Sequence, residues 1–69
     1  MATLKINGVE KEFAGGIPAT VAELLGHLGI EAATVVAEID GEIIERARFS
    51  ETQLRQGQAI ELVRFVPGG

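Results

Sequence analysis

The side chains that could do chemistry are few, and each lacks the partners that its chemistry requires. His27 is the single histidine, and the chain has no cysteine. A zinc site needs several nitrogen, sulfur or carboxylate ligands that converge, so His27 does not predict one. Ser50 has no histidine base adjacent in sequence to activate it as a nucleophile. We therefore interpret His27 as a helix residue that interacts with the helix dipole, and Ser50 as a helix-capping residue.

Carboxylates gather in the middle of the chain, at Glu38, Asp40, Glu42 and Glu45. Paired acids can do acid–base chemistry, but a domain this small is not expected to enclose a pocket of the usual ligand size. These acids are more typical of a solvated edge. The stretch "EFAGGI" lacks the Lys-Ser/Thr that follows the glycines of a phosphate-binding loop. We expect no catalytic residue, no metal and no bound cofactor within the chain.

The end of the sequence, "RFVPGG", offers a different group, the terminal carboxylate of Gly69. Without Cβ atoms, Gly68 and Gly69 could pass through a channel too narrow for other residues. An ionised carboxylate, with an ordinary pKa of about 3.5, is a poor acyl donor. Adenylation by ATP is the usual activation, and a separate enzyme would have to perform it. Glycine-rich ends also fray, so composition alone leaves a tail without function open.

Composition sets the class of protein. The chain has 69 residues, of which 46% are hydrophobic and 4% aromatic, so we expect one small domain with an aliphatic core. Its net charge of −4 has the wrong sign for a phosphate backbone, and we discount nucleic acid as a partner. No stretch approaches the roughly 18 apolar residues of a membrane helix, and no leader is visible. We expect no membrane association and a cytoplasmic location.

The first half of the chain predicts a hairpin and a helix. "TLKINGVEKEF" alternates with period two around Asn-Gly, the residues that a type I′ turn favours. Val21, Leu24, Leu25 and Leu28 form the apolar stripe of a helix over residues 21–28. Thr20 and Glu23 predict a capping box, and Gly29 predicts the helix end. Gly26 inside this helix suggests a close approach to the sheet.

The second half predicts further strands. "VVAEID" and "EIIE" flank an Asp-Gly turn and indicate a second hairpin. Ser50 and Gln53 suggest a capped single helical turn, with Leu54 as its anchor and Gly57 as its end. "QAIELVRFV" reads as the last strand. Its exposed end carries Val63 and Phe65, which are candidates for partner binding.

This order, β-β-α-β-β-turn-β, predicts an α+β fold of the β-grasp, ubiquitin-like type: a mixed sheet of about five strands with one main helix packed on one face. The first and last strands would be central neighbours. A two-layer sheet with another strand order is the alternative. We expect residues 1–66 to form the domain and residues 67–69 a flexible Gly-Gly tail.

The chain resembles the ThiS/MoaD sulfur-carrier family, and most closely its ThiS branch. The resemblance covers essentially the whole chain and is carried by the opening hairpin, "TVAELL", "DGEIIER", "QGQAIELV" and the terminal "GG". It implies that Gly69 is adenylated, becomes a thiocarboxylate and donates sulfur for the thiazole ring of thiamine. Gly68 would then be the spacer that lets Gly69 enter an active site. Pro67 departs from the branch, in which small or β-branched residues usually precede the glycines.

The same resemblance implies the partners. They are an E1-like (ThiF-like) adenylyltransferase that uses ATP, a cysteine desulfurase as the sulfur source, and a ThiG-like thiazole synthase. The chain itself would be a carrier and co-substrate, not an enzyme. Open alternatives are a carrier for molybdopterin or for cysteine and homocysteine biosynthesis, a ubiquitin-like modifier whose activated glycine is attacked by a lysine, and a plain interaction domain.

Overall fold

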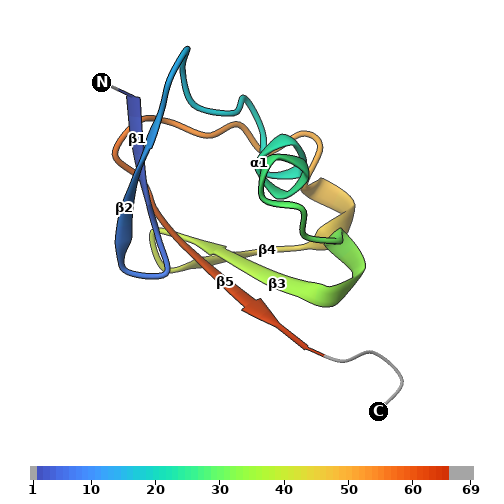
Figure 1. The fold of residues 1–69 in the computed structure, drawn as a ribbon. Coiled ribbons are helices and arrows are strands. Elements are labelled where there is room, and N and C mark those ends of the chain that lie inside the picture. The colour runs from blue at the N-terminus through green and yellow to red at the C-terminus, as the bar shows by residue number, and fades with distance from the viewer. Residues whose placement is uncertain (1, 66–69) are drawn as a thin grey trace.

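The structure is a computed structural model that describes residues 2–65. Its five strands are β1 (Ala2–Ile6), β2 (Val9–Phe13), β3 (Val35–Ile39), β4 (Glu42–Ile44) and β5 (Ala59–Arg64). They form one mixed sheet in the order β2-β1-β5-β3-β4, in which β1 and β5 are parallel and the other pairs antiparallel (Figure 1). The predicted β-grasp arrangement, with the first and last strands as central neighbours, is confirmed.

Both predicted hairpin turns are present, and each uses positive φ angles at its two central residues. Asn7 and Gly8 have φ of 51° and 81° between β1 and β2, and Asp40 and Gly41 have 48° and 88° between β3 and β4. Asparagine, aspartate and glycine are the residues that tolerate this region best. The turn chemistry thus fixes the register of both hairpins.

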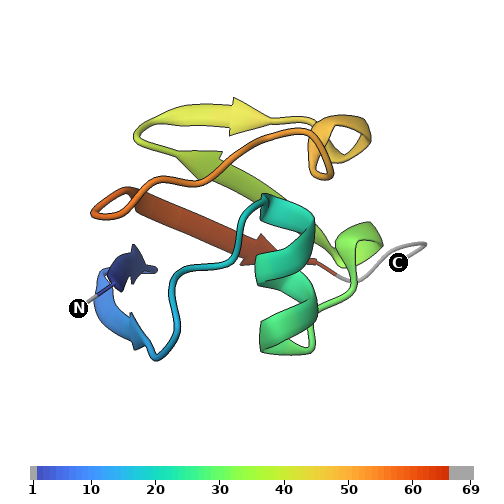
Figure 2. The same ribbon diagram turned by 90° about the horizontal axis from the view of Figure 1, so that it is seen from above.

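Helix α1 (Val21–Leu28) lies on one side of the sheet, and the other side is left uncovered (Figure 2). The helix ends as predicted, because Gly29 has φ 72° and its N–H bonds to the Gly26 carbonyl. The N–H of Ile30 then reaches the Leu25 carbonyl at 2.9 Å, which completes a Schellman motif. The predicted role of Gly26 is wrong: it is exposed, and a Cβ built there would meet no atom within 4 Å.

The core lies between α1 and the sheet and is aliphatic, with two phenylalanines at its edges. Burial alternates along β3 and along the first four residues of β5, so one face of each strand packs into the core. The buried hydrophobic residues are Leu4, Phe13, Val21, Leu24, Leu25, Val35, Ala37, Ile39, Phe49, Leu54, Ile60 and Leu62. The described residues bury no polar or charged side chain, so the core itself is stabilised by apolar packing.

The segment between β4 and β5 corrects the sequence prediction. Its helical turn is a 3-10 turn at Arg46–Arg48, earlier than the Ser50–Gln53 box suggested, and Ser50 is exposed. The reason is Phe49, which is 3% exposed and anchors the segment in the core ahead of Leu54. An apolar anchor outweighs a surface cap, since burying a phenylalanine contributes about 2–3 kcal/mol.

The same segment completes the start of α1. The first N–H groups of a helix have no partner within it. The Val21 N–H donates to the Thr52 carbonyl and the Ala22 N–H to the Phe49 carbonyl, both at 3.1 Å, and the Glu23 N–H donates to Thr20 Oγ1 at 3.2 Å. Thr20 therefore caps the helix as predicted, but a distant loop supplies the other acceptors.

Candidate functional site

The last strand, β5, pairs with β3 from Ile60 to Arg64, and it pairs with β1 at its first two residues, Ala59 and Ile60. It lies between β1 and β3, and its inward residues Ile60 and Leu62 are 1% and 6% exposed. Beyond Arg64, the Phe65 N–H donates to the Thr34 carbonyl at 2.9 Å. Whatever follows Phe65 therefore starts from a fixed position at one edge of the fold.

The two turn residues with positive φ also bind β5 through their side chains. Asn7 Oδ1 accepts from the Leu62 N–H at 2.7 Å, and Asn7 Nδ2 donates to the Leu62 carbonyl at 3.2 Å. The amide thus imitates one more residue of β1 in the ladder with β5. At the other end of the strand, Asp40 Oδ1 accepts from the Ala59 N–H at 3.0 Å. Each hairpin turn therefore fastens the strand that leads to the tail.

The uncovered face of the sheet carries exposed hydrophobic side chains, which we call the open patch: Val36, Ile43, Val63 and Phe65. Their exposed fractions are 42%, 67%, 62% and 47%. Val36 and Val63 lie directly opposite each other in the β3–β5 register. Single exposed hydrophobic residues are ordinary, but a contiguous group marks a candidate interaction surface.

The open patch adjoins a shallow hollow. Phe65, Val36 and Ile43 line a depression of about 380 Å³ together with residues of β3, β4 and the 3-10 turn that precedes β3 (Ala32–Thr34), and Glu45 and Arg46 complete the lining. This side of the molecule is therefore concave and largely apolar close to Phe65, with one acidic and one basic residue in the lining. The prediction that Val63 and Phe65 bind a partner is consistent with these positions, and it stays a prediction.

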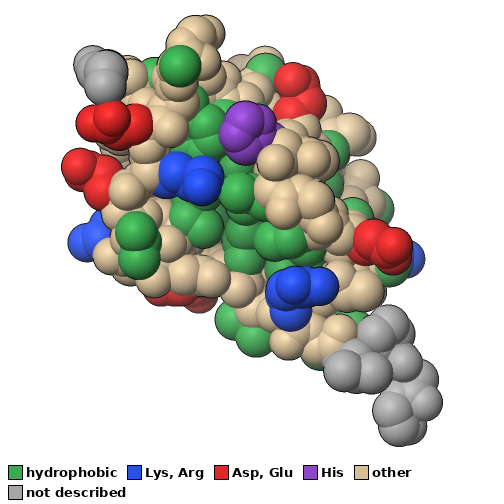
Figure 3. Space-filling model, viewed as in Figure 1, with side chains coloured by type: hydrophobic (Ala, Val, Ile, Leu, Met, Phe, Trp, Pro, Cys, Tyr) green, Lys and Arg blue, Asp and Glu red, His purple; other side chains and the backbone are tan. Residues whose placement is uncertain are grey.

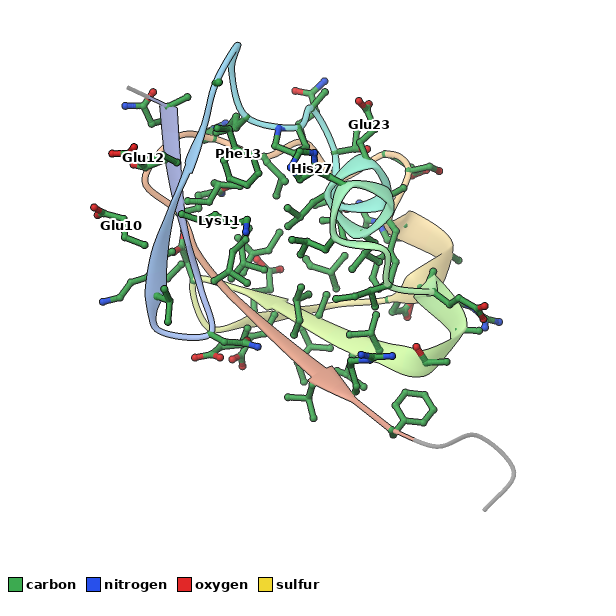
Figure 4. All side chains as sticks on the ribbon, in the orientation of Figure 1. Glu10, Lys11, Glu12, Phe13, Glu23 and His27 are labelled. Carbon is green, nitrogen blue, oxygen red and sulfur yellow. The ribbon has the colours of Figure 1, made fainter. Side chains whose placement is uncertain are left out.

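His27 lies in a different place. Its ring centroid is 5.3 Å from that of Phe13, and the two side chains approach each other from α1 and β2 (Figure 4). Hydrophobic side chains gather on this face, with the histidine at their rim (Figure 3). Glu12, Glu23 and His27 border a hollow of about 400 Å³ there. Within residues 2–65, no group of three potential ligands is close enough to hold a metal ion.

The four carboxylates interpreted as a solvated edge lie in different places, although Glu42 and Glu45 line the same hollow. Asp40 is engaged with Ala59, Glu38 lies on the uncovered face, and Glu42 and Glu45 are exposed near β4. No helix in the described part of the chain is long and apolar enough to cross a membrane. The predicted sulfur-bearing Gly69, its spacer Gly68 and the boundary at residue 66 lie outside the described residues, as does Pro67.

Two features of this region escaped the sequence prediction. Val36 and Ile43 join the open patch only because β3 lies beside β5 and β4 lies beside β3, a consequence of strand order. The hydrogen bonds from Asn7 to Leu62 link residues 55 positions apart, and no short sequence pattern predicts them. Alternation along "VVAEID" does place Val36 on the face opposite to Val35 and Ala37, so with Val63 and Phe65 three of the four patch residues could be found from pattern alone.

Comparison with known proteins agrees with this architecture. The model of the ThiS family matches residues 4–69. A thiazole synthase from Paramagnetospirillum magneticum is 35% identical over 66 residues, which cover 96% of this chain and 20% of that protein. The sulfur carrier protein ThiS of Bacillus subtilis is 33% identical over 66 residues, covering 96% of this chain and 98% of its own length. The chain therefore spans about a fifth of the thiazole synthase and nearly all of the carrier.

A solved structure of a ThiS protein has the same fold as this chain. The crystal structure of the thiamine biosynthesis protein ThiS from Geobacter metallireducens matches with a TM-score of 0.83 at 35% identity, covering 97% of this chain and 99% of that one. The fold is a β-grasp domain, and the match over nearly the full length of a sulfur carrier places it in the class of small carrier domains. The chain belongs to the ThiS family.

Proposed function

We propose that this chain is a sulfur carrier protein of thiamine biosynthesis and that the carboxyl group of Gly69 carries the sulfur. The observation that supports this most strongly is the family match, which runs through residue 69 and so includes both glycines. The Bacillus subtilis relative, aligned over nearly its full length, is itself named a sulfur carrier. In this role the chain is a co-substrate, and its partners perform the catalysis.

The proposed chemistry takes place at the carboxylate in two steps. An oxygen of the Gly69 carboxylate attacks the α-phosphorus of ATP in the active site of a ThiF-like enzyme, and pyrophosphate leaves. A sulfur nucleophile then attacks the carbonyl carbon, the bond to AMP breaks, and a thiocarboxylate remains. If the nucleophile is instead the outer sulfur of a cysteine persulfide, an acyl disulfide forms first. A second thiol then attacks the inner sulfur, a disulfide forms, and the thiocarboxylate is the leaving group.

Two observations support the rest of the scheme. The chain has no cysteine, so it cannot hold sulfur as a persulfide of its own. A segment similar to this chain forms a fifth of a protein named thiazole synthase, which favours a ThiG-like enzyme as the sulfur acceptor. A cytoplasmic location stays a prediction, and cell fractionation with mass detection of the chain would test it.

The test is intact-mass spectrometry of the full chain after incubation with ATP, a ThiF-like enzyme, a cysteine desulfurase and cysteine. We expect a gain of about 16 Da, the replacement of one oxygen by sulfur at an activated carboxyl. A variant without Gly69 should gain nothing. No mass gain with the full chain, or the same gain without Gly69, would refute the proposal. Isopeptide adducts with lysines would instead indicate a protein modifier.

A further inference from the structure

The open patch surrounds a pair of like charges. Glu38 on β3 and Glu61 on β5 are directly opposite each other in the antiparallel register. On its other side Glu38 faces Ile43 of β4. Along the same face, Val36 precedes Glu38 by two residues, and Val63 follows Glu61 by two. The two carboxylates are therefore bordered by apolar side chains of the patch.

This pairing is unfavourable for the isolated domain. Opposite residues in an antiparallel pair have Cβ atoms about 4.5–5.5 Å apart, and like charges in these positions destabilise a sheet. The nearest cation in register is Lys5, which lies beside Ala59 and directly opposite Glu10 on β2. Lys5 is therefore diagonal to Glu61 and already faces another acid. Within the described residues, Glu38 and Glu61 therefore face each other, and no lysine or arginine lies directly opposite either of them in the sheet.

The position of the pair relative to Gly69 indicates which partner it meets. Gly69 follows Phe65 by four positions, a span of at most about 14 Å even for an extended chain. An enzyme that receives the Gly69 carboxylate must therefore bring the surface around its active site close to Phe65. Since Phe65 belongs to the open patch, that surface lies within reach of Glu38 and Glu61.

We propose that an arginine or lysine side chain of the enzyme that adenylates Gly69 binds between Glu38 and Glu61, while apolar side chains beside it pack on the open patch. This inference rests on the proposed function. Charge complementarity decides the occupant: two copies of this chain packed face to face would bring four carboxylates together, whereas a cation relieves the repulsion of the pair. Arginine is also enriched in interface cores, where it packs over apolar surface.

The test separates binding from folding by reversing one charge. In Glu61→Lys, the new lysine faces Glu38, so the variant gains a favourable cross-strand pair and its Tm should rise. The same change places a cation where the enzyme is proposed to place its own, so Kd for the ThiF-like enzyme should rise about tenfold or more. If Glu61 had only a structural role, a variant with a higher Tm would bind the enzyme at least as tightly as the wild-type chain.

A charge-neutralising pair of variants supplies the matched control. Glu38→Gln with Glu61→Gln should weaken binding and flatten its dependence on salt, because the pair no longer attracts a cation. Glu23→Gln with Glu51→Gln changes the net charge equally at exposed sites outside the sheet and should leave Kd within about twofold. Binding is measured by calorimetry with the ThiF-like enzyme at low and high salt.

The outcomes distinguish this inference from the proposed function. If the wild-type chain gains the thiocarboxylate but both double variants bind equally well, the cation site is refuted while the carrier function stands. If sedimentation shows a dimer that Glu61→Lys abolishes while enzyme binding is unchanged, the patch joins two copies and the inference is likewise wrong. If the wild-type chain is never adenylated, the proposed function fails first.

Discussion

The side chain of Asn7 offers the sharpest test of how the fold holds β5. The substitution Asn7→Gly keeps a residue that accepts the observed φ of 51°, but it removes both hydrogen bonds to Leu62. A typical bond of this kind contributes about 0.5–1.5 kcal/mol net, so the loss should cost about 1–3 kcal/mol. For a domain of this size, each kcal/mol lowers Tm by roughly 4–8 °C.

The assay is urea denaturation together with amide exchange. The midpoint should fall at an unchanged slope, since the area exposed on unfolding stays nearly the same. The Leu62 amide should lose protection more than its neighbours in β5, because Asn7 Oδ1 is its acceptor. Asp40→Gly is the matched control: it is also a turn residue with positive φ, but it loses only one exposed side-chain bond.

The comparison of these two variants can refute the reasoning. Asn7→Gly should destabilise the domain more than Asp40→Gly, because it removes two partly buried bonds against one exposed bond. If the two variants lose the same free energy of unfolding, or if the exchange rate of the Leu62 amide is unchanged, the Asn7 side chain does not stabilise β5 as argued.

Three further changes have defined outcomes. Gly26→Ala should raise the free energy of unfolding by about 0.5–1 kcal/mol, since the residue is exposed within the helix and a methyl group would meet no atom within 4 Å. A lower Tm in thermal denaturation would contradict this. Leu24→Ala, at a fully buried position, should lower the free energy of unfolding by about 2–5 kcal/mol, measured by urea denaturation. A decrease below about 1 kcal/mol would mean that Leu24 is not central to the core. Val63→Ser and Phe65→Ser should each leave stability within about 0.5 kcal/mol but slow adenylation, measured as pyrophosphate release; an unchanged rate would remove the open patch from the encounter.

Local chemistry explains why so much of the fold could be predicted. Asn-Gly and Asp-Gly can form tight turns that few other pairs allow, and the stripe of Val21, Leu24 and Leu25 has only one face to bury. The turn and helix signals each lie within about ten residues, so they could be interpreted without the rest of the chain. The strand order was expected from the order of the elements, but another order stayed open, because pairing between distant strands such as β1 and β5 decides it.

The predictions that failed depend on contacts between distant segments. Ser50 and Gln53 have the spacing of a cap, yet the turn forms earlier because Phe49 is buried beneath α1 and offers its carbonyl to Ala22. Gly26 suggested close packing, but the helix turns that side to solvent. A serine caps a helix, or a glycine allows close packing, only if the neighbouring apolar residues are buried in the matching positions. Those positions depend on how the whole sheet packs, so a short stretch of sequence does not reveal them.

The arrangement around β5 also explains how a small domain can present a reactive end. A terminal strand at a sheet edge would open easily, because fraying exposes few contacts. Here the last strand is central, parallel to β1 and antiparallel to β3, and Asn7 and Asp40 fasten it at two points. An enzyme that draws Gly69 into its active site would pull on a strand whose end pairs with β3, whose middle is bound by Asn7 at Leu62, and whose first residues pair with β1. The domain can thus remain folded, and the open patch in register, while its end is bound elsewhere.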